Sequence, residues 1–161
     1  MIRIALVDDH APVRQSLRDY LDSCPGLQVV AEGRNGAQAA AIAVDLAPDV
    51  LVMDLAMPGQ NGMDGLADLR ARAPGVAVLI LSGYPPELFA PAMLARGAAG
   101  FVHKHCAPEQ IVEAVRAVAQ GRAVPAALPL QALAHRPSPS PAPAPAERPP
   151  VGLTRSEDAA A

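Results

Sequence analysis

The chain has 161 residues, a formal net charge of −3 and two cysteines, Cys24 and Cys106. This length suggests one domain with a remainder, the mild acidity gives no sign of affinity for nucleic acids or membranes, and two cysteines are too few for a disulfide framework. Because no signal peptide opens the sequence and no apolar stretch approaches the roughly 18 residues that span a bilayer, we expect a cytoplasmic protein without a membrane partner.

Apolar runs alternate with helical patterns over the first 122 residues. We expect strands at Ile2–Val7, Leu27–Glu32, Val50–Met53, Val76–Leu81 and Gly100–Val102, and helices at about 12–23, 36–46, 64–72, 86–96 and 108–120. The last helix has the clearest pattern, because its apolar residues recur at helical spacing between Pro108 and Gly121. Five strands that alternate with five helices predict an α/β fold, a doubly wound, five-stranded parallel sheet with helices on both faces.

Prolines mark two departures from this pattern. Pro91 falls inside the fourth helix, where a proline removes a backbone hydrogen bond, so we expect that helix to be short or bent. From residue 123 the composition shifts to proline and alanine, as in "PSPSPAPAPAERPP", which cannot form a core. We therefore divide the chain into a domain at 1–122, an extended Pro/Ala-rich linker at 123–152 and a short remainder at 153–161.

Acidic side chains follow two of the expected strands. Asp8 and Asp9 come directly after the first strand, and Asp54 comes after the third. The carboxyl ends of parallel strands meet at one edge of the sheet, where ligands bind, so these carboxylates should lie together. Three like charges at close range raise each other's pKa unless a cation lies between them. A hard divalent ion with oxygen ligands suits the site, and Mg²⁺ suits it best.

Two other strand ends add a hydroxyl and an ammonium group. Ser82 follows the fourth apolar run and Lys104 follows the fifth. Mg²⁺, a lysine and a hydroxyl around a carboxylate nucleophile describe a site for phosphoryl transfer, with Asp54 as the acceptor. No Gly-x-x-x-x-Gly-Lys loop is present to hold a nucleotide, so the phosphoryl donor is something else. A phosphorylated carboxylate is a labile mixed anhydride, which suits a timed switch. An alternative role for Ser82 is the N-cap of the next helix.

Four segments, taken together, resemble the receiver domain of bacterial two-component response regulators. They are "LVDDH" (6–10), "MDLAMPGQNG" (53–62), "LSG" (81–83) and "GAAGFVHK" (97–104), which match the family's acidic pair, phosphoacceptor segment, switch hydroxyl and lysine segment in the right order. The resemblance covers residues 1–122 and implies a flavodoxin-like strand order, 2-1-3-4-5. It also implies a protein that is no enzyme, beyond phosphoryl transfer and dephosphorylation on its own aspartate.

The resemblance assigns the acceptor and the metal ligands. Asp54 would accept a phosphoryl group from the phosphohistidine of a sensor histidine kinase. Asp9, Asp54 and the backbone carbonyl of Ala56 would hold Mg²⁺ directly, and Asp8 would act on it through water.

It also assigns the residues that respond to phosphorylation. Ser82 and Lys104 would bind phosphoryl oxygens, and the rotamer of Phe101 would report the state of Ser82. The added charge, roughly −1.5 to −2, would reposition the loop after Ser82 and the face made by the fourth helix, fifth strand and fifth helix.

The C-terminal part implies a subtype and an output. "KHCAPEQIVEAVRAVAQGRAVPA" (104–126) is similar to the fifth helix and linker of the NarL/LuxR-type regulators, and "GLTRSE" (152–157) is similar to the start of their helix-turn-helix output domain, although Ser156 departs from the usual arginine. Either the natural product ends at residue 161 or the chain is a shortened form of a longer protein. In both cases we expect DNA contact only through an output domain absent from this chain.

Two questions stay open, and one alternative is disfavoured. The first question is whether the protein controls transcription or is a stand-alone receiver that acts through protein contacts. A small phosphatase with Asp54 as nucleophile is disfavoured, because haloacid-dehalogenase-type phosphatases carry a second aspartate where this chain has Ala56. The apolar faces of the fourth and fifth helices either pair in a homodimer or belong to the core.

Overall fold

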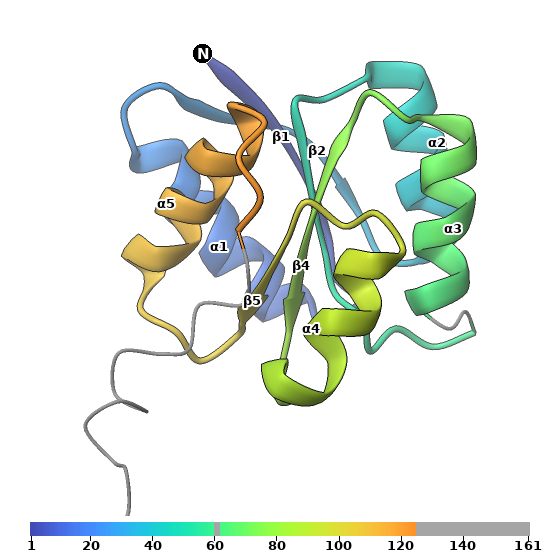
Figure 1. Cartoon of the computed structure of the whole chain (residues 1–161). Coiled ribbons are helices and arrows are strands. Elements are labelled where there is room, and N and C mark those ends of the chain that lie inside the picture. The colour runs from blue at the N-terminus through green and yellow to red at the C-terminus, as the bar shows by residue number, and fades with distance from the viewer. Residues whose placement is uncertain (60–61, 125–161) are drawn as a thin grey trace, which may run out of the picture.

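The computed structural model describes residues 1–59 and 62–124. Within them, five strands alternate with five helices (Figure 1). The strands are β1 (Ile2–Val7), β2 (Leu27–Gly33), β3 (Val50–Met53), β4 (Ala77–Ser82) and β5 (Gly100–His103), and the helices are α1 (Ala11–Ser23), α2 (Gly36–Leu46), α3 (Gly62–Arg72), α4 (Pro86–Ala95) and α5 (Pro108–Ala119). Every expected element is present, with ends shifted by two residues at most. All but the first two residues of the predicted linker, and the whole remainder at 153–161, lie outside the described residues.

The five strands form one parallel sheet in the order β2-β1-β3-β4-β5, which confirms the predicted architecture. The order reverses at β1, because β2 lies on one side of it and β3 on the other. Such a reversal opens a crevice beyond the carboxyl ends of the two central strands. Val7 lies opposite Met53 in the register, so Asp8 and Asp54, which follow them, leave neighbouring strands at the same level.

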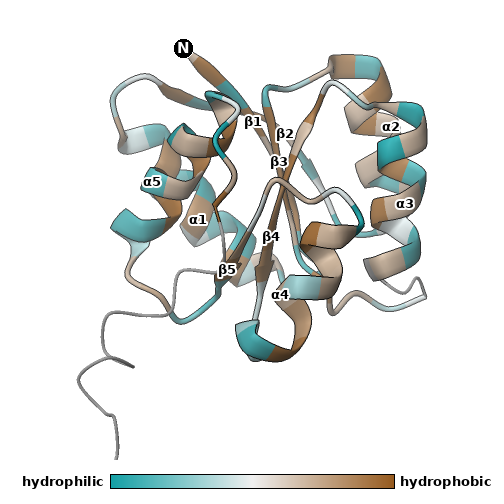
Figure 2. Ribbon diagram, viewed as in Figure 1, coloured by the Kyte–Doolittle hydropathy of each residue, from teal (hydrophilic) through white to brown (hydrophobic). Residues whose placement is uncertain are grey.

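Alternate side chains of each strand enter two separate cores. Val7 and Met53 belong to the cluster under α2, α3 and α4, whereas Leu6 and Val52 belong to the cluster under α1 and α5. Figure 1 shows the two groups of helices on opposite sides of the sheet, and Figure 2 shows the strands between them in hydrophobic colours. Because β3 and β4 are covered on both faces, their sequences are apolar on consecutive residues.

Helix α4 runs without interruption through Pro91 to Ala95. At ten residues it is the shortest of the five described helices, in line with the expected short helix, and the bend stays a prediction. The proline removes the hydrogen bond to the carbonyl of Glu87, one turn earlier. Both residues are exposed, so water can satisfy that carbonyl. None of the described helices is long and apolar enough to cross a membrane.

The chain returns to the sheet after α5. The backbone N–H of Val124 donates to the carbonyl of Ala99 at 3.0 Å, and Val124 forms an isolated parallel bridge with Gly100. A Cβ atom at Gly100 would lie 2.9 Å from a methyl carbon of Leu79 and 3.0 Å from the Cβ of Val124. Glycine at position 100 therefore allows the start of the predicted linker to cover the edge strand.

Candidate functional site

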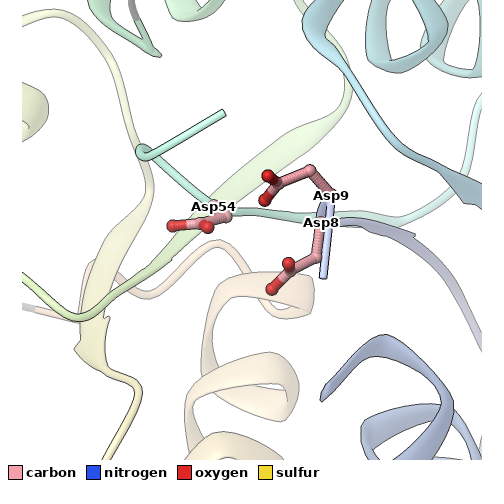
Figure 3. A group of neighbouring side chains, drawn as sticks. All are labelled: Asp8, Asp9 and Asp54. Atoms are coloured by element: carbon pink, nitrogen blue, oxygen red, sulfur yellow. The ribbon is translucent and has the colours of Figure 1, made fainter. Parts of the chain in front are cut away.

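The three predicted acids converge at the carboxyl edge of the sheet. One carboxylate oxygen from each of Asp8, Asp9 and Asp54 can be chosen so that all lie within 4.8 Å of one another. Figure 3 shows Asp8 and Asp9 leaving the end of β1 and Asp54 leaving the neighbouring strand, with the three carboxylates turned to the same side. The register of β1 against β3 produces this meeting, since the backbone N–H of Asp54 donates to the carbonyl of Val7 at 2.9 Å.

The three acids differ in how the protein holds them. Asp54 is 4% exposed and Asp8 is 6% exposed, whereas Asp9 faces solvent. The backbone N–H of His10 donates to Asp8 Oδ1 at 2.7 Å, and that of Ala56 donates to Asp54 Oδ1 at 3.1 Å. The two buried carboxylates are thus oriented by the loops that follow their strands, while Asp9 stays accessible to a ligand from solvent.

Lys104 lies between the two buried carboxylates. Its Nζ atom is 2.7 Å from Asp8 Oδ2 and 2.8 Å from Asp54 Oδ2. Burial lowers the pKa of Lys104, but the hydrogen bonds and charges of Asp54 and Asp8 outweigh this and raise it above the ordinary value. Lys104 is also the single lysine of the chain, against twelve arginines. The ammonium group of Lys104 thus lies at the acidic cluster, as its position after the fifth strand predicted.

A divalent cation fits this arrangement. One ammonium group faces three carboxylates, so a net negative charge is left at the site. The donor atoms are all oxygens, which Mg²⁺ and Ca²⁺ prefer, and an exposed acid beside a buried one leaves room for the waters that Mg²⁺ retains. The residues that would hold the ion are Asp9 and Asp54, with the carbonyl of Ala56 in the adjoining loop.

The loop after β3 is fixed by its apolar residues. Leu55 and Met57 are buried in the core under α3 and α4, whereas Ala56 between them is exposed. Gly59 then adopts a positive φ of 83°, which glycine takes without strain. This alternation holds the backbone of Ala56 beside Asp54 while the loop turns toward α3.

Ser82 is fully buried at the end of β4. Its Oγ accepts a hydrogen bond from the backbone N–H of Tyr84 at 3.1 Å, and its carbonyl accepts one from the backbone N–H of Lys104 at 2.9 Å. The alternative role as an N-cap is wrong, because α4 begins at Pro86 with Pro85 as its N-cap. The hydroxyl instead accepts a local hydrogen bond from two residues later, a turn that serine commonly forms.

Phe101 lies in β5 opposite Ile80, and it is fully buried. Both side chains enter the core cluster under α4. Ser82 follows Ile80 by two residues and therefore points to the same face of the sheet, diagonally across from Phe101. This placement is compatible with communication between the two side chains, and the switch role of Phe101 stays a prediction.

Arg14 is a site neighbour that sequence reasoning missed. It lies on α1 at 8% exposure, and its Nη1 donates to the backbone carbonyl of Asp8 at 2.6 Å. A signal was present in the sequence, because Arg14, Leu17 and Leu21 share helical spacing on the side of α1 that faces the sheet. A charged residue on an apolar stripe has to find buried polar partners.

Comparison with known protein families gives a match over most of the folded part. Residues 4–116 match the family model described as the response regulator receiver domain. The chain is 38% identical over 122 residues to the transcriptional regulatory protein DegU of Brevibacillus brevis, covering 76% of this chain and 52% of DegU. It is 34% identical over 121 residues to the nitrate/nitrite response regulator NarL of Escherichia coli K12, covering 75% of this chain and 56% of NarL.

Solved structures agree with these relatives. A two-component response regulator of the LuxR family from Aurantimonas sp. SI85-9A1 superposes with a TM-score of 0.75 at 34% identity, covering 83% of this chain and 94% of that one. The signal receiver domain of a response regulator named NarL from Mycobacterium tuberculosis gives 0.71 at 32% identity, covering 75% and 98%. The present chain spans about half the length of the curated relatives it matches.

Proposed function

The chain belongs to the response regulator receiver domain family, and from this we propose that it is a phosphorylation-activated switch in which Asp54 accepts a phosphoryl group from a sensor histidine kinase. The environment of Asp54 is the main support for this proposal. Asp54 is a buried carboxylate beside two further acids and the single lysine of the chain. Such a group is poorly placed as a structural acid and well placed as a nucleophile beside a cation.

The residues around Asp54 have different roles in the proposed phosphoryl transfer. An oxygen of Asp54 attacks phosphorus, the P–N bond of the donor phosphohistidine breaks, and the imidazole leaves with that electron pair. Bound Mg²⁺ would neutralise phosphoryl oxygens and would be held by Asp9, Asp54 and the carbonyl of Ala56. Lys104, already 2.8 Å from Asp54 Oδ2, can follow the developing negative charge on the phosphoryl group. Asp8 keeps the ammonium group in place at 2.7 Å.

The conformational response begins at Ser82. In the present structure its Oγ accepts from the N–H of Tyr84, so the hydroxyl hydrogen is available for an acceptor that arrives at Asp54. A phosphoryl group adds roughly −1.5 to −2 charge and three acceptor oxygens. Drawing Ser82 toward the phosphoryl group would shift the loop that leads into α4. We propose that this face of α4, β5 and α5 carries the signal onward.

The output of the switch is transcriptional in this proposal. DegU and NarL are named as transcriptional or response regulators, and both are about twice as long as the matched region. A cytoplasmic histidine kinase domain is the proposed donor, and DNA contact is assigned only to an output domain outside the receiver fold. The chemistry consists of forming and hydrolysing one anhydride on Asp54, so we expect no turnover of a separate substrate.

A homodimer would have to use limited apolar surface. Four apolar residues of α5 are buried in the core and unavailable for pairing (Ile111, Ala114, Val115 and Val118), whereas Val112, Ala117 and Ala119 are partly buried. On and before α4, Leu88 is 71% exposed and Tyr84 is 44% exposed. If two copies pair through these elements, we propose that α4 supplies the apolar contact.

The test is the mass of the intact protein after incubation with acetyl phosphate and Mg²⁺. We expect one phosphoryl adduct that needs Mg²⁺ and is absent from Asp54→Asn, which removes the nucleophile but keeps the side-chain shape. Asp68→Asn, in an exposed acid on α3, is the matched control and should keep the adduct. An adduct that survives Asp54→Asn would place the modification elsewhere and contradict the proposal.

A further inference from the structure

Arg14 belongs with the site residues by its burial. In the part of the chain that the structure describes, four polar or charged residues are buried: Asp8, Arg14, Asp54 and Ser82. Three of them are predicted site residues, and the proposed phosphoryl transfer leaves Arg14 without a role. Arg14 also lines a small, partly open pocket together with Asp8 and Asp54. A buried guanidinium this close to the acidic cluster needs an explanation beyond packing.

The guanidinium group is held from two directions. Its Nη1 donates to the carbonyl oxygen of Asp8 at 2.6 Å, and its Nε donates to Glu32 Oε2 at 2.9 Å. The other oxygen of Glu32 pairs with Arg18, one turn further along α1. Burial raises the pKa of Glu32, but the hydrogen bonds from Arg18 and Arg14 outweigh it and keep the carboxylate charged. Glu32, near the end of β2, therefore fixes the direction in which Arg14 points.

The contact of Arg14 falls on the peptide that joins Asp8 to Asp9. A peptide group is planar, so a hydrogen bond to its carbonyl oxygen also fixes the direction in which the chain continues into Asp9. The backbone N–H of Asp8 donates to the carbonyl of Gly33 at 3.1 Å, and the Asp8 carboxylate is held by His10 on one oxygen and Lys104 on the other. Asp9 is exposed and, among the described residues, has no ion-pair partner to orient it. The plane of this peptide is thus a main determinant of where the Asp9 carboxylate lies.

We propose that Arg14 is a positioning residue for the divalent-cation site, acting on Asp9 through the Asp8–Asp9 peptide and braced by Glu32. This inference rests on the proposed function, because it assumes that the acidic cluster binds a cation. The positive charge of Arg14 and its positioning role have opposite expected effects on cation affinity. As a positive charge alone, Arg14 would weaken cation binding, so its removal would tighten it. As a positioning residue it strengthens binding, so its removal weakens it.

The test is titration of the full chain with Mn²⁺ in the absence of any phosphoryl donor, with free Mn²⁺ followed by electron paramagnetic resonance. Arg14→Lys keeps the charge, but one ammonium nitrogen replaces the guanidinium fork that serves the Asp8 carbonyl and Glu32 together. We expect its dissociation constant for Mn²⁺ to rise about tenfold, as for other groups that orient metal ligands. Arg18→Lys is the matched control, because Arg18 contacts Glu32 and Asp22 but not Asp8, and should leave it unchanged.

A second variant tests the positioning role without the positive charge, and it gives a result even if the first variant misfolds. Arg14→Met removes the positive charge and fills the same buried space, and we expect weaker Mn²⁺ binding here too. Tighter binding by Arg14→Met, or equal dissociation constants for Arg14→Lys and wild type, would overturn the positioning role. Equal weakening by Arg14→Lys and Arg18→Lys would also overturn it, since the effect would then pass through Glu32 alone.

Phosphorylation gives an independent readout. If Arg14→Lys loses only cation affinity, saturating Mg²⁺ restores its acetyl-phosphate adduct to the wild-type level, whereas a general packing defect is not rescued. Failure of rescue in a variant that melts like wild type would contradict the proposal. Wild-type protein that binds no Mn²⁺ would overturn both this inference and the metal assignment. Mn²⁺ binding that is insensitive to Arg14 would overturn this inference alone.

Discussion

The charged groups at the two ends of the β1–β3 pair differ in how their charges are compensated. At the amino end, the backbone N–H of Arg3 donates to Asp49 Oδ2 at 2.7 Å. The Arg3 guanidinium donates to the carbonyls of Leu46 and Ala47, at 2.9 and 3.3 Å, where α2 ends. A cation at a helix C-terminus is favourable in itself, and these groups satisfy one another locally.

At the carboxyl end of the same strands the charges do not balance. Among the described residues, Lys104 is the one cation that forms ion pairs with the three acids there: it pairs with the buried Asp8 and Asp54, and Asp9 has no ion-pair partner. Charged groups that are satisfied locally, as at the amino end, contribute to the stability of the fold. An excess of negative charge, as at the carboxyl end, favours binding of a cation. The contrast leads to four predictions.

The largest effect is expected when Lys104, which pairs with both buried acids, is replaced. Lys104→Met should lower the free energy of unfolding by about 2 kcal/mol without divalent ions, because two buried carboxylates lose their partner. Mg²⁺ should restore part of the loss, since it replaces the missing positive charge. Urea denaturation with and without Mg²⁺ measures both quantities. The same loss in both conditions would show that the acids do not share a cation.

Asp9→Asn should stabilise the folded protein but weaken its binding of divalent cations. Removing the charge of Asp9, which has no ion-pair partner in the described part of the chain, relieves repulsion. It should raise the free energy of unfolding by about 0.5 kcal/mol without divalent ions, a small effect because the group is exposed. The same change should weaken Mn²⁺ binding about tenfold or more, as a ligand is lost. Urea denaturation and Mn²⁺ titration give the two numbers. A variant that binds Mn²⁺ as tightly as wild type would remove Asp9 from the ligand set.

Arg3→Met probes the amino end. It should cost about 1 kcal/mol of unfolding free energy, because the carbonyls of Leu46 and Ala47 lose a donor. Mn²⁺ affinity and the acetyl-phosphate adduct should match wild type, since the two ends share strands but no contacts. A change in cation affinity here would mean that the ends are coupled through the sheet.

The pH dependence at the alkaline end should report Lys104. Its pKa is raised in the folded protein by Asp54 and Asp8, so its contribution to stability is fully present below its unfolded-state pKa near 10.5 and is lost as pH rises through the folded value. Only the onset of this loss falls in the range where melting can be followed. Wild type should lose stability above pH 10.5 more steeply than Lys104→Met. Parallel curves for the two proteins would contradict the raised pKa.

Most of the fold was predictable because it depends on local patterns. Consecutive apolar residues in β3 and β4 indicated strands buried on both faces, and the spacing in α5 indicated a helix with one apolar face. The sequence could not tell whether the helix ends at Pro91, because the cost of a missing helical hydrogen bond depends on exposure. The turn made by Ser82 was missed because it depends on where α4 begins, four residues later.

The sequence on its own specified the elements, the parallel sheet and the acids, serine and lysine at the strand ends, because each of these follows from residue type and spacing along the chain. Tertiary structure decided how the groups pair. Lys104 reaches two acids rather than one, and Arg14 of α1 reaches both β2 and the peptide after β1. These contacts join residues from separate elements, and their geometry depends on strand register and helix placement. Among the residues that the structure describes, the same geometry leaves Asp9 without an ion-pair partner, while Asp8 and Asp54 are paired.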